Sequence, residues 1–181
     1  MKNIEIKVEC DDLDRVCQSA LESGATDVGT FEQIDTFFSV PKGRLKLRQE
    51  GSAGRLIAYE RTDRAELRIS SFDNVELEEP GKALVVLRRV LPVIGVVRKT
   101  RHLLILHSTR IHLDVVESLG SFVELETIVT TQSLAEAQAE AELVAKTLGV
   151  DKMRAVPVAY IDLLDEHLLP NKRTKGGDSG H

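Results

Sequence analysis

The chain has 181 residues, with 29 acidic and 24 basic side chains, a formal net charge of −5 and 42% hydrophobic residues. These totals are typical of one globular domain that buries a substantial core. The negative charge and the 4% aromatic content, without Trp, argue against a nucleic-acid-binding surface and against a platform on which bases stack.

The two cysteines and the N-terminal residues indicate the compartment. Cys10 and Cys17 have neither a zinc-site spacing nor a CxxC pattern, so we interpret them as small hydrophobes in a reducing compartment. Charges interrupt the first 20 residues, and the sequence has no apolar run of the ~20 residues that a membrane span needs. We therefore expect a cytoplasmic protein without a signal peptide or a membrane-spanning segment.

The first predicted elements are a strand and a helix. Residues 3–7 (NIEIK) alternate, so that Glu5 and Lys7 lie on the opposite face from the isoleucines. Asp11 or Asp12 can then cap a helix whose apolar residues recur at helical spacing until Gly24.

Four further strands are predicted in the middle of the chain, at residues 31–40, 44–49, 56–61 and 64–72. Lys46 and Arg48 share one face of the strand that reads RLKLRQ. Arg61 shares a face with Tyr59 in the next strand. A helix is expected over residues 81–91, where leucines recur on one side.

Three more strands are predicted after Pro92 and Gly95, at residues 96–106, 110–116 and 121–129. Lys99 and Arg101 share a face of the first, Asp114 lies on one face of the second, and Glu124 and Glu126 share a face of the third.

The C-terminal part carries one clear helix signal. Ser133 and Glu136 form a capping box that opens a helix ending near Gly149. Residues 157–164 form an apolar segment that could be helix or strand. We predict a single domain over residues 1–168 and a disordered polar tail over residues 169–181.

These elements amount to about eight strands and three main helices, an α+β protein. Short connections between neighbouring strands favour antiparallel pairing. The sheet could be open, with its charged face in water. It could also close into a barrel, with that face turned inward and the helices outside.

The parity of the strands assembles one mixed-charge face, with six cations and four carboxylates: Lys7, Lys46, Arg48, Arg61, Lys99 and Arg101 with Glu5, Asp114, Glu124 and Glu126. The local excess of two cations contrasts with the negative charge of the whole chain. Arginine and lysine suit the oxygens of a tri- or polyphosphate, and carboxylates suit a divalent metal. A solvent face with cross-strand ion pairs is the simpler alternative.

Several segments resemble the CYTH superfamily, the triphosphate tunnel metalloenzymes: NIEIK, DTFF (residues 35–38), GRLKLR, YER, RKTR and above all HLDVVESLGSFVELE (residues 112–126). The sequence is most similar to the class IV adenylate cyclase-like branch. The resemblance implies a closed eight-stranded antiparallel β-barrel, or tunnel, with helices packed outside. It also implies that an organic or inorganic triphosphate binds there with Mg²⁺ or Mn²⁺.

The resemblance further implies roles for single residues. It assigns the metal to Glu5, Asp114, Glu124 and Glu126, and the phosphates to Lys7, Lys46, Arg48, Arg61, Lys99 and Arg101. Among these, Lys7, Lys99 and Arg101 are the predicted catalytic residues. The family's ExExK signature begins here with Asn3, which offers a carbonyl oxygen but no charge.

The predicted function is therefore that of a metal-dependent enzyme acting on a small-molecule triphosphate, with no nucleic-acid or membrane partner. Attack by the ribose 3′-hydroxyl of ATP would give cyclic AMP and pyrophosphate, whereas attack by water would hydrolyse a nucleoside, thiamine or inorganic triphosphate. The alternatives are a non-catalytic polyphosphate- or nucleotide-binding module, which Asn3 favours, and a plain α+β scaffold. The resemblance is compatible with a homodimer.

Overall fold

The structure, a computed structural model, describes residues 2–61 and 68–168, without the side chains of residues 2, 60–61, 68–71 and 165–168. The strands in this part are β1 (Lys2–Glu9), β2 (Thr26–Phe38), β3 (Arg44–Glu50), β4 (Ala53–Arg61), β5 (Arg68–Leu77), β6 (Val93–Leu106), β7 (Thr109–Val116) and β8 (Gly120–Val129). The helices are α1 (Leu13–Glu22), α2 (Pro80–Val90), α3 (Leu134–Thr147) and α4 (Tyr160–Leu168). The predicted tail lies outside the described residues.

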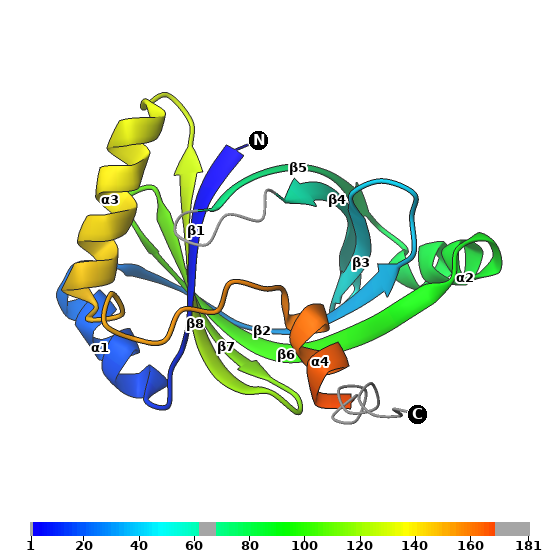
Figure 1. Cartoon of the computed structure of the whole chain (residues 1–181), viewed down its shortest axis with the longest axis horizontal. Coiled ribbons are helices and arrows are strands. Elements are labelled where there is room, and N and C mark those ends of the chain that lie inside the picture. The colour runs from blue at the N-terminus through cyan, green and yellow to red at the C-terminus, as the bar shows by residue number, and fades with distance from the viewer. Residues whose placement is uncertain (1, 62–67, 169–181) are drawn as a thin grey trace, which may run out of the picture.

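The eight strands form one antiparallel sheet that curls around a central space, as Figure 1 shows. Their order around the sheet is β1-β5-β4-β3-β2-β6-β7-β8. β1 pairs with β8 through eight residue pairs, but with β5 only through residues 2–5, opposite residues 68–71. The antiparallel sheet and the helices outside it agree with the sequence prediction.

The predicted closure of the tunnel is only partial in the structure. Beyond residue 5, the second edge of β1 bonds to residues 154–156 instead of β5: Val156 N donates to Lys7 O at 2.8 Å, and Glu9 N donates to Arg154 O at 3.1 Å. The two edges of the curled sheet are therefore joined along only a short part of β1. The connection between α3 and α4 covers the remaining edge, which would otherwise leave backbone groups unpaired.

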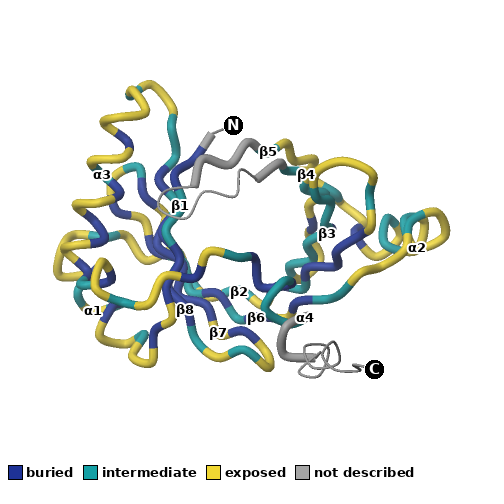
Figure 2. Tube along the Cα trace, viewed as in Figure 1, coloured by how far each residue is buried: buried dark blue, intermediate teal, exposed yellow. Residues whose placement is uncertain are grey.

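The main core lies outside the curled sheet, between β1, β6, β7 and β8 and the helices α1 and α3. Its fully buried residues include Val16, Leu104, Ile111, Val123 and Leu125. Figure 2 shows the buried segments concentrated on this side of the molecule. This core fixes which face of these four strands points inward, since their alternate residues must point away from the helices.

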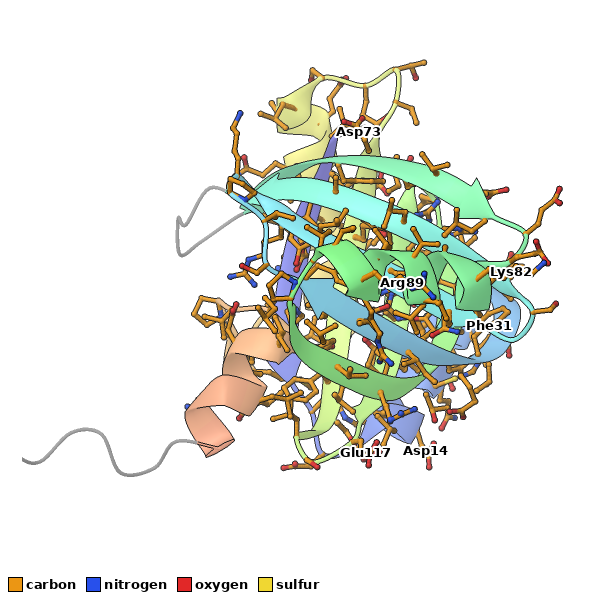
Figure 3. All side chains as sticks on the ribbon, turned by 90° about the vertical axis from the view of Figure 1, so that its right-hand side faces the viewer. Asp14, Phe31, Asp73, Lys82, Arg89 and Glu117 are labelled. Carbon is orange, nitrogen blue, oxygen red and sulfur yellow. The ribbon has the colours of Figure 1, made fainter. Side chains whose placement is uncertain are left out.

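The outer face of β3 and β4 packs against the helix α2. α2 contacts β3 and β4, and Figure 3 shows it across the outer side of the sheet, with Lys82 and Arg89 on the helix. Gly54 of β4 lies against this helix, where an added Cβ would clash with the side chain of Pro80. None of the described helices is long and apolar enough to cross a membrane.

Local sequence signals account for most element boundaries. Asp12 accepts a hydrogen bond from Arg15 N at 3.0 Å and caps α1, and the capping box of Ser133 and Glu136 opens α3 as predicted. β2 begins five residues earlier than predicted, because a bulge at Gly29, with φ +124°, lets an exposed segment continue its pairing with β6. β5 spans residues 68–77 instead of 64–72, and residues 62–67 lie outside the described part.

Candidate functional site

The concave side of the sheet contains a cavity of about 170 Å³ with two unlike walls. We call the first the charged wall; it comes from β1, β6, β7 and β8 and consists of Asn3, Glu5, Lys7, Lys99, Arg101, His112, Glu124 and Glu126. We call the second the aromatic wall; it comes from β2, β4 and β5 and consists of Phe37, Ile57, Tyr59 and Phe72. Asp35, Lys46, Val97, Ala159 and Tyr160 complete the lining.

Strand parity and pairing bring the charged wall together. β1 and β8 are adjacent, so that Glu5 lies opposite Glu126 and Lys7 opposite Glu124. The same alternation turns Lys99 and Arg101 of β6 inward. Seven of the ten predicted site residues thus line one cavity, namely Glu5, Lys7, Lys46, Lys99, Arg101, Glu124 and Glu126.

An ion pair joins β1 to β8 at the centre of the charged wall. Lys7 Nζ lies 3.1 Å from Glu124 Oε1 and 3.7 Å from Glu5 Oε1. Burial alone would raise the pKa of Glu124, but the charge of Lys7, the adjacent His112 imidazole, whose Nδ1 lies 3.5 Å from Glu124 Oε2, and the charge of Arg101 hold it well below its usual range. Glu124 is therefore ionised at neutral pH.

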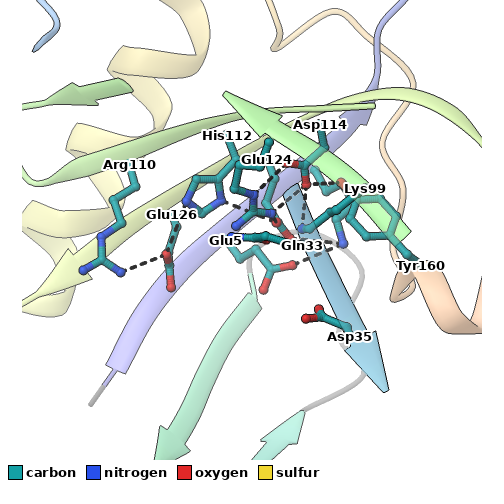
Figure 4. Close-up of polar contacts among 12 residues, drawn as sticks. Glu5, Gln33, Asp35, Lys99, Arg110, His112, Asp114, Glu124, Glu126 and Tyr160 are labelled. Atoms are coloured by element: carbon teal, nitrogen blue, oxygen red, sulfur yellow. Dashed lines mark hydrogen bonds and ion pairs between the residues drawn. The ribbon is translucent and has the colours of Figure 1, made fainter. Parts of the chain in front are cut away.

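Asp114 lies behind the charged wall, not on the cavity surface. It is 0% exposed and accepts four hydrogen bonds: from Lys99 Nζ at 2.9 Å, Arg101 Nε at 2.7 Å, Arg101 Nη2 at 2.6 Å and the Tyr160 hydroxyl at 3.0 Å. Figure 4 shows Asp114 beside Lys99 and Tyr160. In this arrangement its carboxylate positions two cations, whereas the sequence predicts it to be a metal ligand.

The protonation of Lys99, one of the two cations that donate to Asp114, is also altered. Burial, and then repulsion from Arg101, lower the pKa of Lys99 from 10.5 to about 7, although Asp114 opposes the change. Lys99 is therefore divided between charged and neutral forms near neutral pH. Burial and then Asp114 raise the pKa of the Tyr160 hydroxyl, which stays protonated as a donor.

Asp35 is a cavity-lining residue that the sequence reasoning did not include in the candidate site. It is buried, and it accepts from Lys46 Nζ at 2.9 Å and from Arg48 Nε and Nη2 at 2.7 Å each. Burial would raise its pKa, but Arg48 and Lys46 outweigh that effect and lower it well below the usual range. Arg48, held in this way, lines a neighbouring pocket at the β3–β4 turn. The sequence does contain a signal for Asp35, because this residue lies on the same face as Phe37 in the strand predicted at residues 31–40.

Asp35 also corrects the predicted charge balance. The described part of the cluster contains five cations and five carboxylates: Lys7, Lys46, Arg48, Lys99 and Arg101 with Glu5, Asp35, Asp114, Glu124 and Glu126. The predicted excess of two cations is therefore absent from these residues. The side chain of Arg61, the sixth predicted cation, lies outside the described part, at the end of β4.

Glu126 has different neighbours. The Asn3 side-chain amide donates to it, and Arg110 Nη1 lies 3.4 Å from its Oε2. His112 Nε2 lies 3.9 Å from the same oxygen, and burial followed by repulsion from Arg101 lowers the pKa of this imidazole. At neutral pH His112 is a neutral neighbour of the two glutamates on β8.

The cavity carboxylates supply the oxygen donors that a hard divalent cation binds. The described residues contain no group of three or more His, Cys, Asp or Glu side chains already arranged for a metal. Mg²⁺ commonly binds one or two carboxylates and completes its shell with waters and phosphate oxygens. Glu5 and Glu126, which face each other across β1 and β8, fit this limited requirement by their chemistry.

α4 adds Tyr160, whose role the sequence could not suggest because residues 157–164 had no clear periodicity. Its ring lies 4.3 Å from Lys7 Nζ and 5.1 Å from Lys99 Nζ, centroid to nitrogen. Asp162 of the same helix pairs with Arg44 at 2.9 Å, which fastens α4 to β3. The C-terminal helix thus forms part of the cavity.

One family model and several solved structures match this chain. The family model described as the CYTH domain matches residues 1–160. The PH1012 protein from Pyrococcus horikoshii OT3 is 26% identical, with 89% of this chain and 98% of that chain covered and a TM-score of 0.79. A conserved hypothetical protein from Pyrococcus furiosus is also 26% identical, with 89% and 99% covered and a TM-score of 0.77.

A more distant structure shares the fold. It is a proposed adenylate cyclase from Vibrio parahaemolyticus, 17% identical, with 90% of this chain and 97% of that chain covered and a TM-score of 0.74. No curated protein matches the sequence at a significant level.

Proposed function

The chain belongs to the CYTH family, and on that premise we propose that it is a metal-dependent enzyme that binds a triphosphate in the tunnel and cleaves a phosphoanhydride bond. The observation that carries the proposal is the ion-paired cluster around the cavity. Five buried or half-buried cations lie among five carboxylates there. Apolar side chains could fill the same space without the cost of burying charge.

A charge-balanced cluster of this kind suits a ligand that carries both signs. Triphosphate oxygens would replace Glu124 as the partner of Lys7 and Arg101 and Asp35 as the partner of Lys46, whereas Asp114 would continue to position Lys99 and Arg101. The carboxylates released from these cations would then need a positive partner, because an unpaired buried charge is costly. A divalent metal bound with the triphosphate supplies that charge.

Glu5, Glu124 and Glu126, three of the four metal ligands that the family resemblance implies, would hold the metal. When bound, Mg²⁺ or Mn²⁺ would neutralise charge on the phosphate oxygens. For Asp114 the contacts favour a positioning role, because metal binding there would require Lys99, Arg101 and Tyr160 to move away.

The cations would position the triphosphate and stabilise the charge that develops during the reaction. Phosphoryl chemistry depends mainly on positioning and on stabilising charge on the transferred and leaving oxygens. Arg101, which Asp114 and Glu124 hold in place, would be one donor for that purpose. Lys99, with a pKa of about 7, could also accept the proton of the attacking hydroxyl or water.

Two reactions fit this site. If the attacking group is the ribose 3′-hydroxyl of ATP, the products are cyclic AMP and pyrophosphate. If it is water, the products are a diphosphate and phosphate. The first corresponds to the class IV adenylate cyclase-like resemblance, and the second to a triphosphatase.

The test is to measure phosphate release and cyclic AMP formation on one purified sample. ATP, thiamine triphosphate and tripolyphosphate are each supplied with Mg²⁺, Mn²⁺ or EDTA. We expect turnover that needs the metal and falls at least about a hundredfold in a Glu124→Gln/Glu126→Gln variant. Turnover that persists in EDTA or in this variant would refute the proposed site.

The interaction between Asn3 and Glu126 favours a second candidate, a non-catalytic triphosphate-binding module. The amide donates to a predicted metal ligand and carries no charge of its own, so the metal could bind weakly. Metal-linked triphosphate binding without turnover would support this candidate. An Asn3→Glu variant should then bind the metal more tightly, as measured by calorimetry.

A further inference from the structure

We infer that the ligand of this cavity is an organic triphosphate with a planar aromatic group, not inorganic tripolyphosphate; this rests on the proposed function. The chain has only seven aromatic residues, five Phe and two Tyr. Four of them line this one cavity, namely Phe37, Tyr59, Phe72 and Tyr160. More than half of the few aromatic side chains in this chain therefore lie beside the cations that we propose bind the phosphates.

The aromatic wall spans the neighbouring strands β2 to β5, with Lys46 of β3 lying between its residues. Tyr59 of β4 lies directly opposite Phe72 of β5, and such cross-strand aromatic pairs are in contact range. Phe37 of β2 lies opposite Lys46 of β3, which in turn lies opposite Ile57 of β4. One row of side chains across β2, β3 and β4 therefore consists of Phe37, Lys46 and Ile57. The neighbouring row contains the aromatic pair of Tyr59 and Phe72.

Lys46 connects the two walls. Its Nζ is 5.6 Å from the centroid of the Phe37 ring and 5.9 Å from that of the Tyr59 ring. The same nitrogen is 2.9 Å from Asp35, in the position that a phosphate oxygen would take. A ligand whose phosphates reach Lys46 therefore has the aromatic wall directly beside its next group.

An inorganic triphosphate would gain nothing from this wall. Its charged oxygens would lose water against aromatic carbon without forming a hydrogen bond, which is unfavourable. An aromatic group at the end of the phosphate chain would instead cover Phe37, Ile57, Tyr59 and Phe72, which are buried or half-buried and still border the cavity. The two walls together match a molecule with an anionic end and a flat apolar end.

The test compares three ligands that share the triphosphate but differ at its end: ATP, methyl triphosphate and tripolyphosphate. Dissociation constants are measured by calorimetry in Mg²⁺, with a parallel series in EDTA as a turnover-free reference. We expect the protein to bind ATP about tenfold more tightly than either of the others.

The variant Phe72→Ala should weaken ATP binding about tenfold and leave tripolyphosphate binding unchanged. Val75→Ala on the same strand is the matched control, because Val75 is 61% exposed and lies on the opposite face. Phe72→Leu keeps apolar volume without the ring, and should show an intermediate loss if Phe72→Ala fails to fold.

The outcomes separate this inference from the proposed function. Equal affinities for the three ligands, or a Phe72 variant that weakens all of them alike, would overturn the inference while the proposed function stands. If no triphosphate binds to the folded protein, both fall. A loss confined to ATP supports both.

Discussion

The charged wall and the aromatic wall border the same cavity but are built in opposite ways. In the charged wall, Arg101 and Lys99 are 6% and 5% exposed and are fixed by several ion pairs. The strands that carry them are backed by α1, α3 and the main core. In the aromatic wall, Ile57, Tyr59 and Phe72 are half-buried, and α2 covers only β3 and β4 from outside.

This difference separates two tasks within one sheet. Ion pairs are directional, and a buried ion pair is strongly destabilised when one partner is lost, so the charged wall must hold its geometry. Apolar contacts have no direction and tolerate changes in shape better, so the aromatic wall can accept a range of groups. We expect changes in the charged wall to affect stability and catalysis, and changes in the aromatic wall to affect the choice of ligand.

The largest expected effect comes from breaking the charged wall at Arg101. The variant Arg101→Ala removes donors from Asp114 and Glu124, and should lower the free energy of unfolding by about 3–5 kcal/mol, measured by urea denaturation. Arg98→Ala on the same strand is the control. Its ion pair with Glu117 is at the surface, so the loss should stay below about 0.5 kcal/mol. Similar losses in both variants would contradict the distinction.

A smaller loss of stability is expected at the helix that closes the cavity. Tyr160→Phe removes one hydrogen bond to Asp114 and leaves those from Lys99 and Arg101, so it should cost about 1.5 kcal/mol. Urea denaturation measures the change. A variant as stable as the wild type would mean that this hydroxyl contributes nothing to holding α4 on the sheet.

Asp35 tests whether a carboxylate competes with the ligand where the two walls meet. Asp35→Asn keeps the shape but removes the charge that holds Lys46 and Arg48, so tripolyphosphate should bind about tenfold more tightly, as measured by calorimetry. Asp73→Asn, at an exposed position on β5, is the control and should leave the affinity unchanged. Weaker binding to Asp35→Asn would show instead that Asp35 positions the two cations.

The smallest effect expected is on pH dependence. Because the pKa of Lys99 is lowered from 10.5 to about 7, its positive charge is present below neutral pH and is lost as the pH rises through 7. Triphosphate affinity should therefore fall by about threefold from slightly acidic to slightly alkaline pH. Lys99→Arg, which stays charged, should lack this component. The same pH profile in both proteins would rule out Lys99 as its source.

Much of the charged wall could be predicted from the sequence because strand parity is a local property. Glu5, Lys7, Glu124 and Glu126 were assigned to one face from alternation alone, and the pairing of β1 with β8 confirms that face. Lys46, Lys99 and Arg101 were placed in the same way. Their catalytic, phosphate-binding and metal-binding roles stay predictions.

The aromatic wall could not be predicted, because no local signal distinguishes its residues. The low aromatic content argued against any stacking platform, yet composition says nothing about where side chains gather. Phe37, Tyr59 and Phe72 come from three strands, and only the pairing of β2, β3, β4 and β5 brings them to one surface. Tyr160 joins them from a helix whose existence the sequence left open.

Residue periodicity and contacts within a few residues were enough to predict the antiparallel sheet, the caps of α1 and α3 and the shared face of the charges, but not whether that face points into a tunnel or into water. Tertiary structure alone decided which charges find partners. It placed Asp114 beneath the wall with Lys99, Arg101 and Tyr160, and it gave Asp35 to Lys46 and Arg48. The same folding left β1 only partly paired with β5. These contacts depend on distances between residues that are far apart in the chain. Alternation along a single strand gives no information about such distances.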